Sequence, residues 1–224
     1  MREELEECGF VLCPGVVSPT DLARLLEAAV FGFEWPDEQA RRKTYAIRHL
    51  LTIRSSLAGL LEATGIDGVA AVALNAGVTA VDATFFDKNA ETNWKVPAHQ
   101  DVVVPAAVAD GTSHVFQRYG ATYTEPSSEI LGTLVAARVH FDDCAADNGA
   151  LYVLPGSHRQ KLPASEIAAV DRGSFVACPA SMGDVLLMKP MLVHRSSPSQ
   201  VPSHRRVLHV LYGPKDRLSS DGAS

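Results

Sequence analysis

The sequence lacks several features that would place it in a specialised class. Its four cysteines are scattered and form no Cys-x-x-Cys pair, so neither a disulfide framework nor a zinc knuckle is predicted. It has no long basic run, and 26 acidic residues outnumber 20 basic ones, which argues against nucleic acid or a membrane surface as a partner. No stretch reaches the roughly 18 apolar residues of a spanning helix, and the acidic first ten residues are unlike a signal peptide. We therefore expect a cytoplasmic protein whose partner is a small molecule.

What is present suits one globular unit. A chain of 224 residues, 46% of them hydrophobic, can bury a core without covalent staples, so we expect a single domain over 1–224. Ser18 and Pro19 begin an amphipathic helix with Leu22, Leu25, Leu26 and Ala29 at helical spacing. A second helical pattern covers 36–62, with a break near 52–56. We expect 1–66 to be a mostly helical cover, 67–213 a β core and 214–224 a tail.

The β core is predicted from short segments rich in valine and alanine that are separated by glycine, proline and Asn-Gly. Such spacing favours an antiparallel sandwich or barrel over a parallel α/β sheet. The predicted strands are 69–74, 79–86, 102–104, 131–141, 150–154, 174–178, 184–188, 191–194 and 205–212. The stretch 105–129 shows little periodicity, and we expect a loop that covers a pocket.

The histidines suggest a metal site, because alternate residues of a strand can point at one ion. His-x-Asp occurs twice, at His99 to Asp101 and at His140 to Asp142. Two histidines and one carboxylate are the ligand set of mononuclear iron(II) oxygenases, so a distal histidine is needed. We prefer His99, Asp101 and His194. In a barrel, several strands separate a ligand pair on an early strand from a distal histidine at the same opening, and the predicted strands between His99 and His194 meet this requirement. The segment with His140 runs instead into a turn.

A cationic side chain follows the distal histidine. Alternation in 205–212 aims Arg205, Val207, His209 and Leu211 to one side of the strand. A buried guanidinium suits a dicarboxylate, and we expect one of Arg205 and Arg206, preferably Arg205, to face the pocket.

The run 139–158, with His99-Gln100-Asp101 before it and His194 and Arg205 after it, resembles the phytanoyl-CoA dioxygenase family of iron(II)/2-oxoglutarate-dependent oxygenases. The resemblance covers about residues 85–212. It implies a double-stranded β-helix, or jelly roll, with iron(II) held by His99, Asp101 and His194. It also implies 2-oxoglutarate bound by Arg205 and Ser196, with dioxygen as the second co-substrate.

The same resemblance implies hydroxylation of an unactivated C–H bond of a small molecule, with succinate and CO2 as co-products. Because halogenating relatives lack the carboxylate ligand, the retained Asp101 favours hydroxylation. Ala98 departs from the bulky aromatic residue common before the His-Gln-Asp triplet, which widens the predicted pocket. The chain has little room for an added substrate domain, which argues against a CoA thioester.

Further side chains are candidates of less weight. Lys88, Trp94, Arg138 and His140 are possible substrate contacts, although core packing is as good an interpretation for Trp94 and a better one for Arg138 and His140. In the expected loop, His114 and Tyr119 are further candidates. We assign His49, His204 and His209 to the surface or to packing, and do not expect His158 to be a ligand.

Two other classes of function stay open from the sequence. One is a metal-binding, cupin-like isomerase or sensor without redox chemistry. The other is a noncatalytic interaction module in which these histidines and aspartates are ordinary polar residues.

Overall fold

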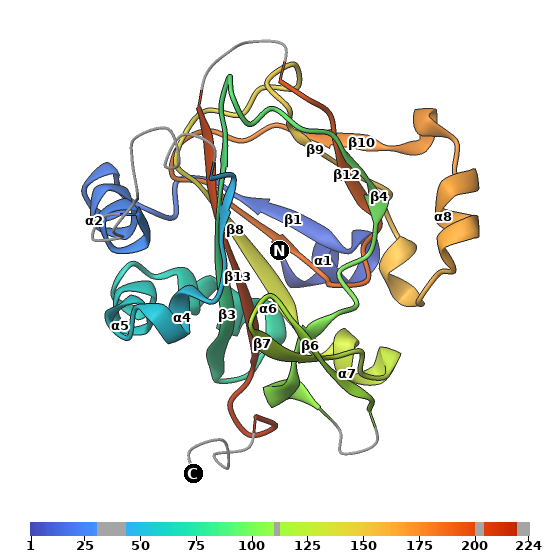
Figure 1. Cartoon of the computed structure of the whole chain (residues 1–224), viewed down its shortest axis with the longest axis horizontal. Helices are drawn as coiled ribbons and strands as arrows, with labels where there is room; N and C mark the ends of the chain where they lie inside the picture. Colours follow the sequence, from blue (N-terminus) through green and yellow to red (C-terminus); the bar gives the residue numbers. More distant parts are fainter. Residues whose placement is uncertain (31–43, 110–112, 200–203, 219–224) are drawn as a thin grey trace.

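A computed structural model describes residues 1–30, 44–109, 113–199 and 204–218, and it contains two facing antiparallel sheets (Figure 1). The larger has the order β1-β11-β8-β13-β3-β2, made of β1 (Phe10–Cys13), β11 (Val185–Met188), β8 (Val135–His140), β13 (Arg205–Pro214), β3 (Val78–Lys88) and β2 (Ala46–Ile47). The smaller has the order β10-β9-β12-β4, made of β10 (Val176–Cys178), β9 (Leu151–Val153), β12 (His194–Ser196) and β4 (Val96–His99).

From β3 onward the chain winds between these two sheets. β3, β8, β11 and β13 lie in the larger sheet, and β4, β9, β10 and β12 in the smaller. Side chains from both sheets share one apolar cluster, which includes Leu151 and Val153 from one and Leu186 and Leu211 from the other. This arrangement is the predicted jelly roll.

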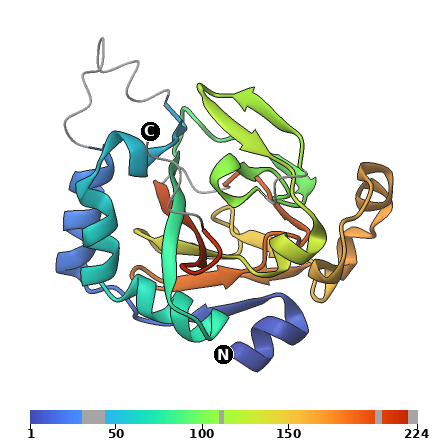
Figure 2. The same cartoon turned by 90° about the horizontal axis from the view of Figure 1, so that it is seen from below.

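The outer face of the larger sheet is covered by helices, as Figures 1 and 2 show for the blue and teal segments. They are α1 (Arg2–Cys8), α2 (Pro19–Val30), α4 (Leu50–Ile53), α5 (Ser56–Ala63) and α6 (Ile66–Leu74). Helix α2 buries Leu22, Leu25 and Ala29 of the predicted apolar stripe, and Leu26 is partly buried against the same core. Because helices cover one face and the smaller sheet the other, β8 is buried at every position.

The prediction of a strand at 69–74 is wrong, because this segment belongs to helix α6. Ile66, Ala70 and Ala73 are its buried residues, at helical spacing, and left-handed Gly65 and Asn75 flank it. A short apolar run is compatible with either element, and here packing on the sheet selects the helix. The helical cover therefore extends to Leu74, beyond the predicted 66.

The prediction for 36–62 is partly wrong. Residues 36–43 lie outside the described residues, and Ala46–Ile47 is an edge strand paired with β3. His49 has a positive φ of 58°, which a helix cannot contain. The break between α4 and α5, at Arg54 and Ser55, falls inside the predicted 52–56.

The stretch 105–129 is not a structureless loop, so this part of the prediction is wrong, although Arg118, Tyr119 and Tyr123 from the stretch do line a cavity. A third sheet has the order β5-β7-β6, with β5 (Val104–Pro105), β6 (Val115–Arg118) and β7 (Ala121–Thr124). Tyr119 and Gly120, both with positive φ, form the two-residue turn of the β6–β7 hairpin. Short helices complete the fold: η1 (Ala106–Val108), α7 (Ser128–Gly132), η2 (Ser157–Arg159), α8 (Ala164–Ala169) and η3 (Arg172–Ser174).

Within the described residues, no single helix has the length and apolar character to cross a membrane. In the part of the chain that the structure describes, one helix pair, α5 with α6, meets those two criteria together, and the pair is bent by 74°. Both helices contribute buried residues to the core beside the larger sheet.

Candidate active site

Strand pairing brings the three predicted metal ligands together. Strands β4 and β12 are antiparallel neighbours with His99 directly opposite His194, and the two ring centroids lie 4.2 Å apart. Asp101 follows β4, where its backbone N–H donates to the Pro190 carbonyl at 2.8 Å. Its carboxylate oxygens lie 3.5 Å from His99 Nε2 and 3.6 Å from His194 Nε2. One ligand atom from each residue lies within 4.8 Å of the others, which is close enough to share one cation.

Backbone carbonyls fix the orientation of both imidazoles. Nδ1 of His99 lies 2.9 Å from the Pro97 carbonyl, and Nδ1 of His194 lies 2.9 Å from the Leu192 carbonyl. A carbonyl only accepts, so each Nδ1 donates, and in the neutral ring Nε2 keeps its lone pair. Both lone pairs therefore face the Asp101 carboxylate, an arrangement that a cation between them stabilises. The donor set fits a divalent metal ion.

The protonation states suit ligation. Burial lowers the pKa of His194 to about 4, so this ring is neutral near pH 7. Burial acts to raise the pKa of Asp101, but His194 and His99 outweigh it and hold the pKa well below its usual range. For His99, burial is outweighed by Asp101, which accepts a hydrogen bond from the protonated ring and attracts its charge, and the pKa rises. A metal ion would displace this proton from His99 Nε2, since the neutral ring is the ligand.

Gln100, between the two ligands, holds their segment in place. Its buried side chain donates from Nε2 to the carbonyls of Met191 and Gln160, the latter at 2.9 Å. Its Oε1 accepts the Leu162 N–H at 2.8 Å. The amide thus ties the His-x-Asp segment to the approach to His194. Gln100 was not among the predicted site residues. Its signal in the sequence is its place between two predicted ligands, where strand alternation turns its side chain to the opposite side.

The three ligands open into a cavity of about 430 Å³, a size typical of small-molecule sites. His194 is only 6% exposed, whereas His99 and Asp101 are 39% and 37% exposed. The other lining residues used below are Tyr45, Arg48, Asp82, Phe86, Trp94, Val102, Val104, Arg118, Tyr119, Tyr123, Arg138, Leu151, Ser196, Arg205 and His209.

Arg205 lies in the cavity beside a second buried cation. Its side chain is 6% exposed, Nη1 donates to the Gly149 carbonyl, and Nε has no partner in the described part of the chain. Lys88 lies opposite Arg205 on the paired strand β3 and is 1% exposed. Its Nζ donates to Ser196 Oγ and to the Ser197 carbonyl, both at 3.0 Å. Burial and the charge of Arg205 lower the pKa of Lys88 to about 7.

Among the described residues, neither Arg205 nor Lys88 forms an ion pair with a carboxylate. Two buried cations and a hydroxyl without an anion make a site that fits a carboxylate ligand. Lys88 does not line the cavity itself. It lies one layer behind, where it orients Ser196.

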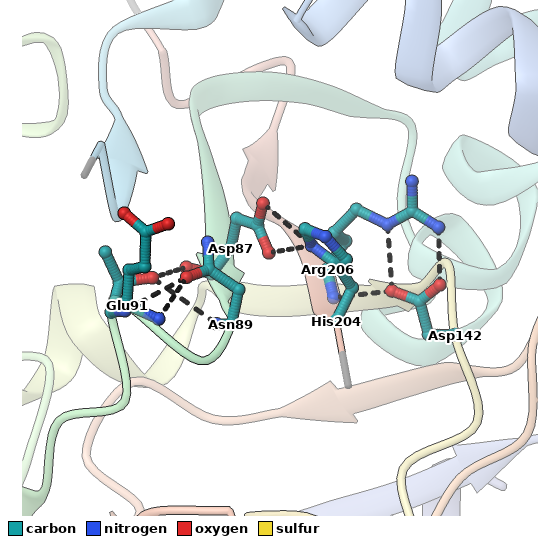
Figure 3. Close-up of polar contacts among 7 residues, drawn as sticks. Asp87, Asn89, Glu91, Asp142, His204 and Arg206 are labelled. Carbon is teal, nitrogen blue, oxygen red and sulfur yellow. Dashed lines mark hydrogen bonds and ion pairs between the residues drawn. The ribbon is translucent and has the colours of Figure 1, made fainter. Parts of the chain in front are cut away.

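Figure 3 shows the ion pairs that flank the start of β13. Arg206 points away from the cavity and donates from Nε and Nη2 to Asp142, at 2.9 and 2.5 Å. On the other side, His204 Nδ1 donates to Asp87 at 2.9 Å. These contacts join β13 to β3 and to the end of β8, which directs the neighbouring Arg205 inward. Of the two arginines, the structure therefore places Arg205 in the cavity.

The weaker candidates divide into two groups. Trp94 and Arg138 line the cavity, and Trp94 packs edge-on against Tyr45 with centroids 5.1 Å apart. His140 is 3% exposed and does not line it, and burial lowers its pKa to about 4. Similarly, Tyr119 lines the cavity and exposed His114 does not.

His209 was assigned to the surface or to packing, but it lines the cavity, and its Nδ1 lies 3.3 Å from Arg138 Nη1. The strand alternation that predicts Arg205 to face the pocket places His209 on the same side of the strand. The rim residues Tyr45, Arg48 and Asp82 were missed too. No local pattern marks Tyr45 and Arg48, because their position depends on the pairing of β2 with β3. Asp82 lies in β3 itself, opposite Leu211 of β13.

A jelly roll that presents two histidines and one carboxylate toward a cavity defines the class of non-heme iron(II) oxygenases. The sequence matches the model of the family described as phytanoyl-CoA dioxygenase (PhyH) over residues 5–207, and the chain belongs to this family. No curated protein matches the chain.

Several solved structures share the fold at low sequence identity. The α-ketoglutarate-dependent epimerase SnoN from nogalamycin biosynthesis is 17% identical, with a TM-score of 0.69 over 100% of this chain and 90% of that one. The carbocyclase SnoK from the same pathway is 19% identical, with a TM-score of 0.64 over 95% and 82%. EctD from S. alaskensis, solved with 2-oxoglutarate and 5-hydroxyectoine, is 18% identical, with a TM-score of 0.70 over 96% and 76%.

Proposed function

We propose that this protein is an iron(II)- and 2-oxoglutarate-dependent dioxygenase that hydroxylates an unactivated C–H bond of a small molecule and releases succinate and CO2. The observation that carries the proposal is the convergence of His99, Asp101 and His194 on one point of a cavity that also contains Arg205. When bound, iron would supply the redox chemistry that couples dioxygen to the decarboxylation of 2-oxoglutarate.

The chain's own residues hold and orient the reactants in this proposal. His99, Asp101 and His194 would hold the metal, and they line the cavity from which the reactants would approach it. Arg205 binds the distal carboxylate of 2-oxoglutarate. Because Ser196 accepts a hydrogen bond from Lys88, its own hydroxyl hydrogen is free to donate to the same carboxylate. The apolar lining, which includes Val102, keeps water from the reacting groups.

Hydroxylation is the finer part of the proposal. SnoN and SnoK are described as an epimerase and a carbocyclase, so this fold alone does not select the outcome. Hydroxylation is supported by Asp101, whose carboxylate lies next to both histidines. Halogenating relatives lack this carboxylate, which leaves room for a halide, so a chain that retains it favours hydroxylation.

The direct test is turnover of 2-oxoglutarate by purified protein with iron(II) under air. We expect succinate to be released, and His99→Ala to abolish the release. His114→Ala is the matched control, because exposed His114 does not line the cavity and its replacement should leave the release unchanged. Succinate release by His99→Ala at the wild-type rate would refute the assignment of His99 as a metal ligand.

A binding measurement separates this proposal from a metal-binding protein without redox chemistry. Anaerobic melting curves with nickel(II) and increasing 2-oxoglutarate should show added stability, about 2.7 kcal/mol at a hundred times Kd. Stabilisation by nickel alone, without any effect of 2-oxoglutarate, would favour the cupin-like isomerase or sensor.

We also propose that residues 1–224 act as one domain. Its apolar core is shared between the helical cover and the larger sheet, as Leu25 and Leu61 pack in one cluster with Val139 and Val210. The cytoplasmic location stays a prediction.

A further inference from the structure

Two arginines at the rim of the cavity lie against the same aromatic ring. Arg118 and Tyr119 come from the tip of the β6–β7 hairpin, and Arg48 follows the edge strand β2. The Arg48 guanidinium carbon lies 4.3 Å from the Tyr119 ring centroid, and that of Arg118 lies 4.8 Å from it. Arg48 also lies 5.5 Å from the ring of Tyr45. Two positive charges therefore lie against one aromatic ring that lines the cavity.

No ion pair neutralises these charges within the described residues. Neither Arg48 nor Arg118 forms an ion pair with a carboxylate there. Asp82, which also lines the cavity, interacts electrostatically with both His49 and Arg48, and His49 is the nearer, with Nδ1 3.8 Å from the carboxylate. One carboxylate against two guanidinium groups leaves a net positive charge at the rim. With both charges at one ring of the rim, a ligand that brings an anionic group to this point is stabilised.

Between the rim and the metal ligands the cavity wall is mostly apolar. Phe86 and Trp94 supply aromatic surface, and Val102, Val104 and Leu151 supply aliphatic surface. A ligand that fills this space therefore needs an apolar body and an anionic end that stays at the rim.

We infer that the substrate is a small amphiphilic anion, whose carboxylate or phosphate monoester group binds Arg48 and Arg118 while its apolar part extends toward His99, Asp101 and His194. Planar guanidinium groups bind both kinds of anion in bidentate fashion. The identification of this ligand as the substrate rests on the proposed function. The anion site itself does not.

Binding can be measured without turnover. The protein is loaded with nickel(II) in place of iron and saturated with 2-oxoglutarate, which keeps added acids away from Arg205. Isothermal titration then compares phenylacetate and benzyl phosphate, which distinguish the two anions, with neutral phenylacetamide. We expect at least one anion to bind about tenfold more tightly than the amide, as for a charge-assisted hydrogen bond.

Variants assign the effect to the rim. Arg48→Gln and Arg118→Gln should each weaken anion binding by about tenfold and leave amide binding unchanged. Arg48→Lys should recover part of the loss. Arg24→Gln is the matched control, because it removes one charge from the exposed face of α2, away from the cavity. Melting temperatures check that each variant folds.

The inference is overturned if the amide binds as well as both anions, if neither anion binds, or if both arginine variants bind the anions as the wild type does. Failure of the proposed function gives a different result, namely no stabilisation by nickel(II) and 2-oxoglutarate together. In that case Arg48- and Arg118-dependent anion binding still supports an anion site at the rim.

Discussion

Lys88 offers a quantitative test of the interior of the site, through the substitution Lys88→Met. The methionine keeps the length of the side chain and removes the charge and the hydrogen bonds to Ser196 and Ser197. Burial and the charge of Arg205 lower the pKa of Lys88 from 10.5 to about 7. At 1.36 kcal/mol per pKa unit, the charged form costs the ligand-free protein about 5 kcal/mol.

The sign of the effect on stability follows from proton counting. Between about pH 7 and 10.5 the unfolded chain binds more protons at Lys88 than the folded chain does, so wild-type stability rises with pH across this window. Below pH 7 the cost of the buried charge is fully present. The substitution removes that cost and loses hydrogen bonds worth about 1–3 kcal/mol. We expect Lys88→Met to be more stable by about 2–4 kcal/mol at pH 6 and less stable above pH 10.5.

The assay is urea unfolding of metal-free protein from pH 6 to pH 10.5. The free energy of unfolding of the wild type should rise over this range relative to that of Lys88→Met. Lys95→Met is the control: because Lys95 is exposed, this variant should show the same pH dependence of stability as the wild type. A parallel pH dependence in wild type and Lys88→Met would refute the assignment of a buried, charge-destabilised lysine.

The same substitution should act in the opposite direction on co-substrate binding. A bound dicarboxylate near Arg205 and Ser196 stabilises charged Lys88, so the wild-type affinity for 2-oxoglutarate should fall as pH rises above 7. Lys88→Met should bind it about tenfold more weakly at pH 7, with that dependence lost. Unchanged affinity would mean that Lys88 acts on the fold alone.

Three further predictions concern the ligands and their support. Asp101→Ala should abolish stabilisation by nickel(II) in melting curves, since it removes the anionic ligand; retained stabilisation would place the metal elsewhere. Gln100→Leu should weaken nickel affinity roughly 10–100-fold in a competition titration with a chelator, with the three ligands intact, because it frees their segment. Tyr212→Phe removes the 2.7 Å hydrogen bond from β13 to Asp67 in α6 and should cost about 1–3 kcal/mol in one unfolding transition; two transitions would contradict a single domain.

Much of the fold follows from local patterns. The stripe of Leu22, Leu25 and Ala29 identified helix α2, and eight of the nine predicted strands coincide at least in part with observed strands or, for 191–194, with the first residue of β12. The errors fall where local patterns are ambiguous. The apolar run 69–74 suits a strand or a helix, and only its packing on the sheet decides between them. The hairpin at Tyr119 was missed because a tyrosine in a left-handed turn carries no strong signal.

For the site, the sequence by itself supplied the residue types and the short-range spacing: His99 and Asp101 two residues apart, and Arg205 alternating with His209 along one strand. Only the tertiary structure decided that His194 lies opposite His99, that Gln100 locks their segment, and that Arg48 meets Arg118 across Tyr119. These relations join segments remote in the chain and depend on strand register. A slip of one residue would turn His194 to the other face of its sheet, and no local pattern fixes that register.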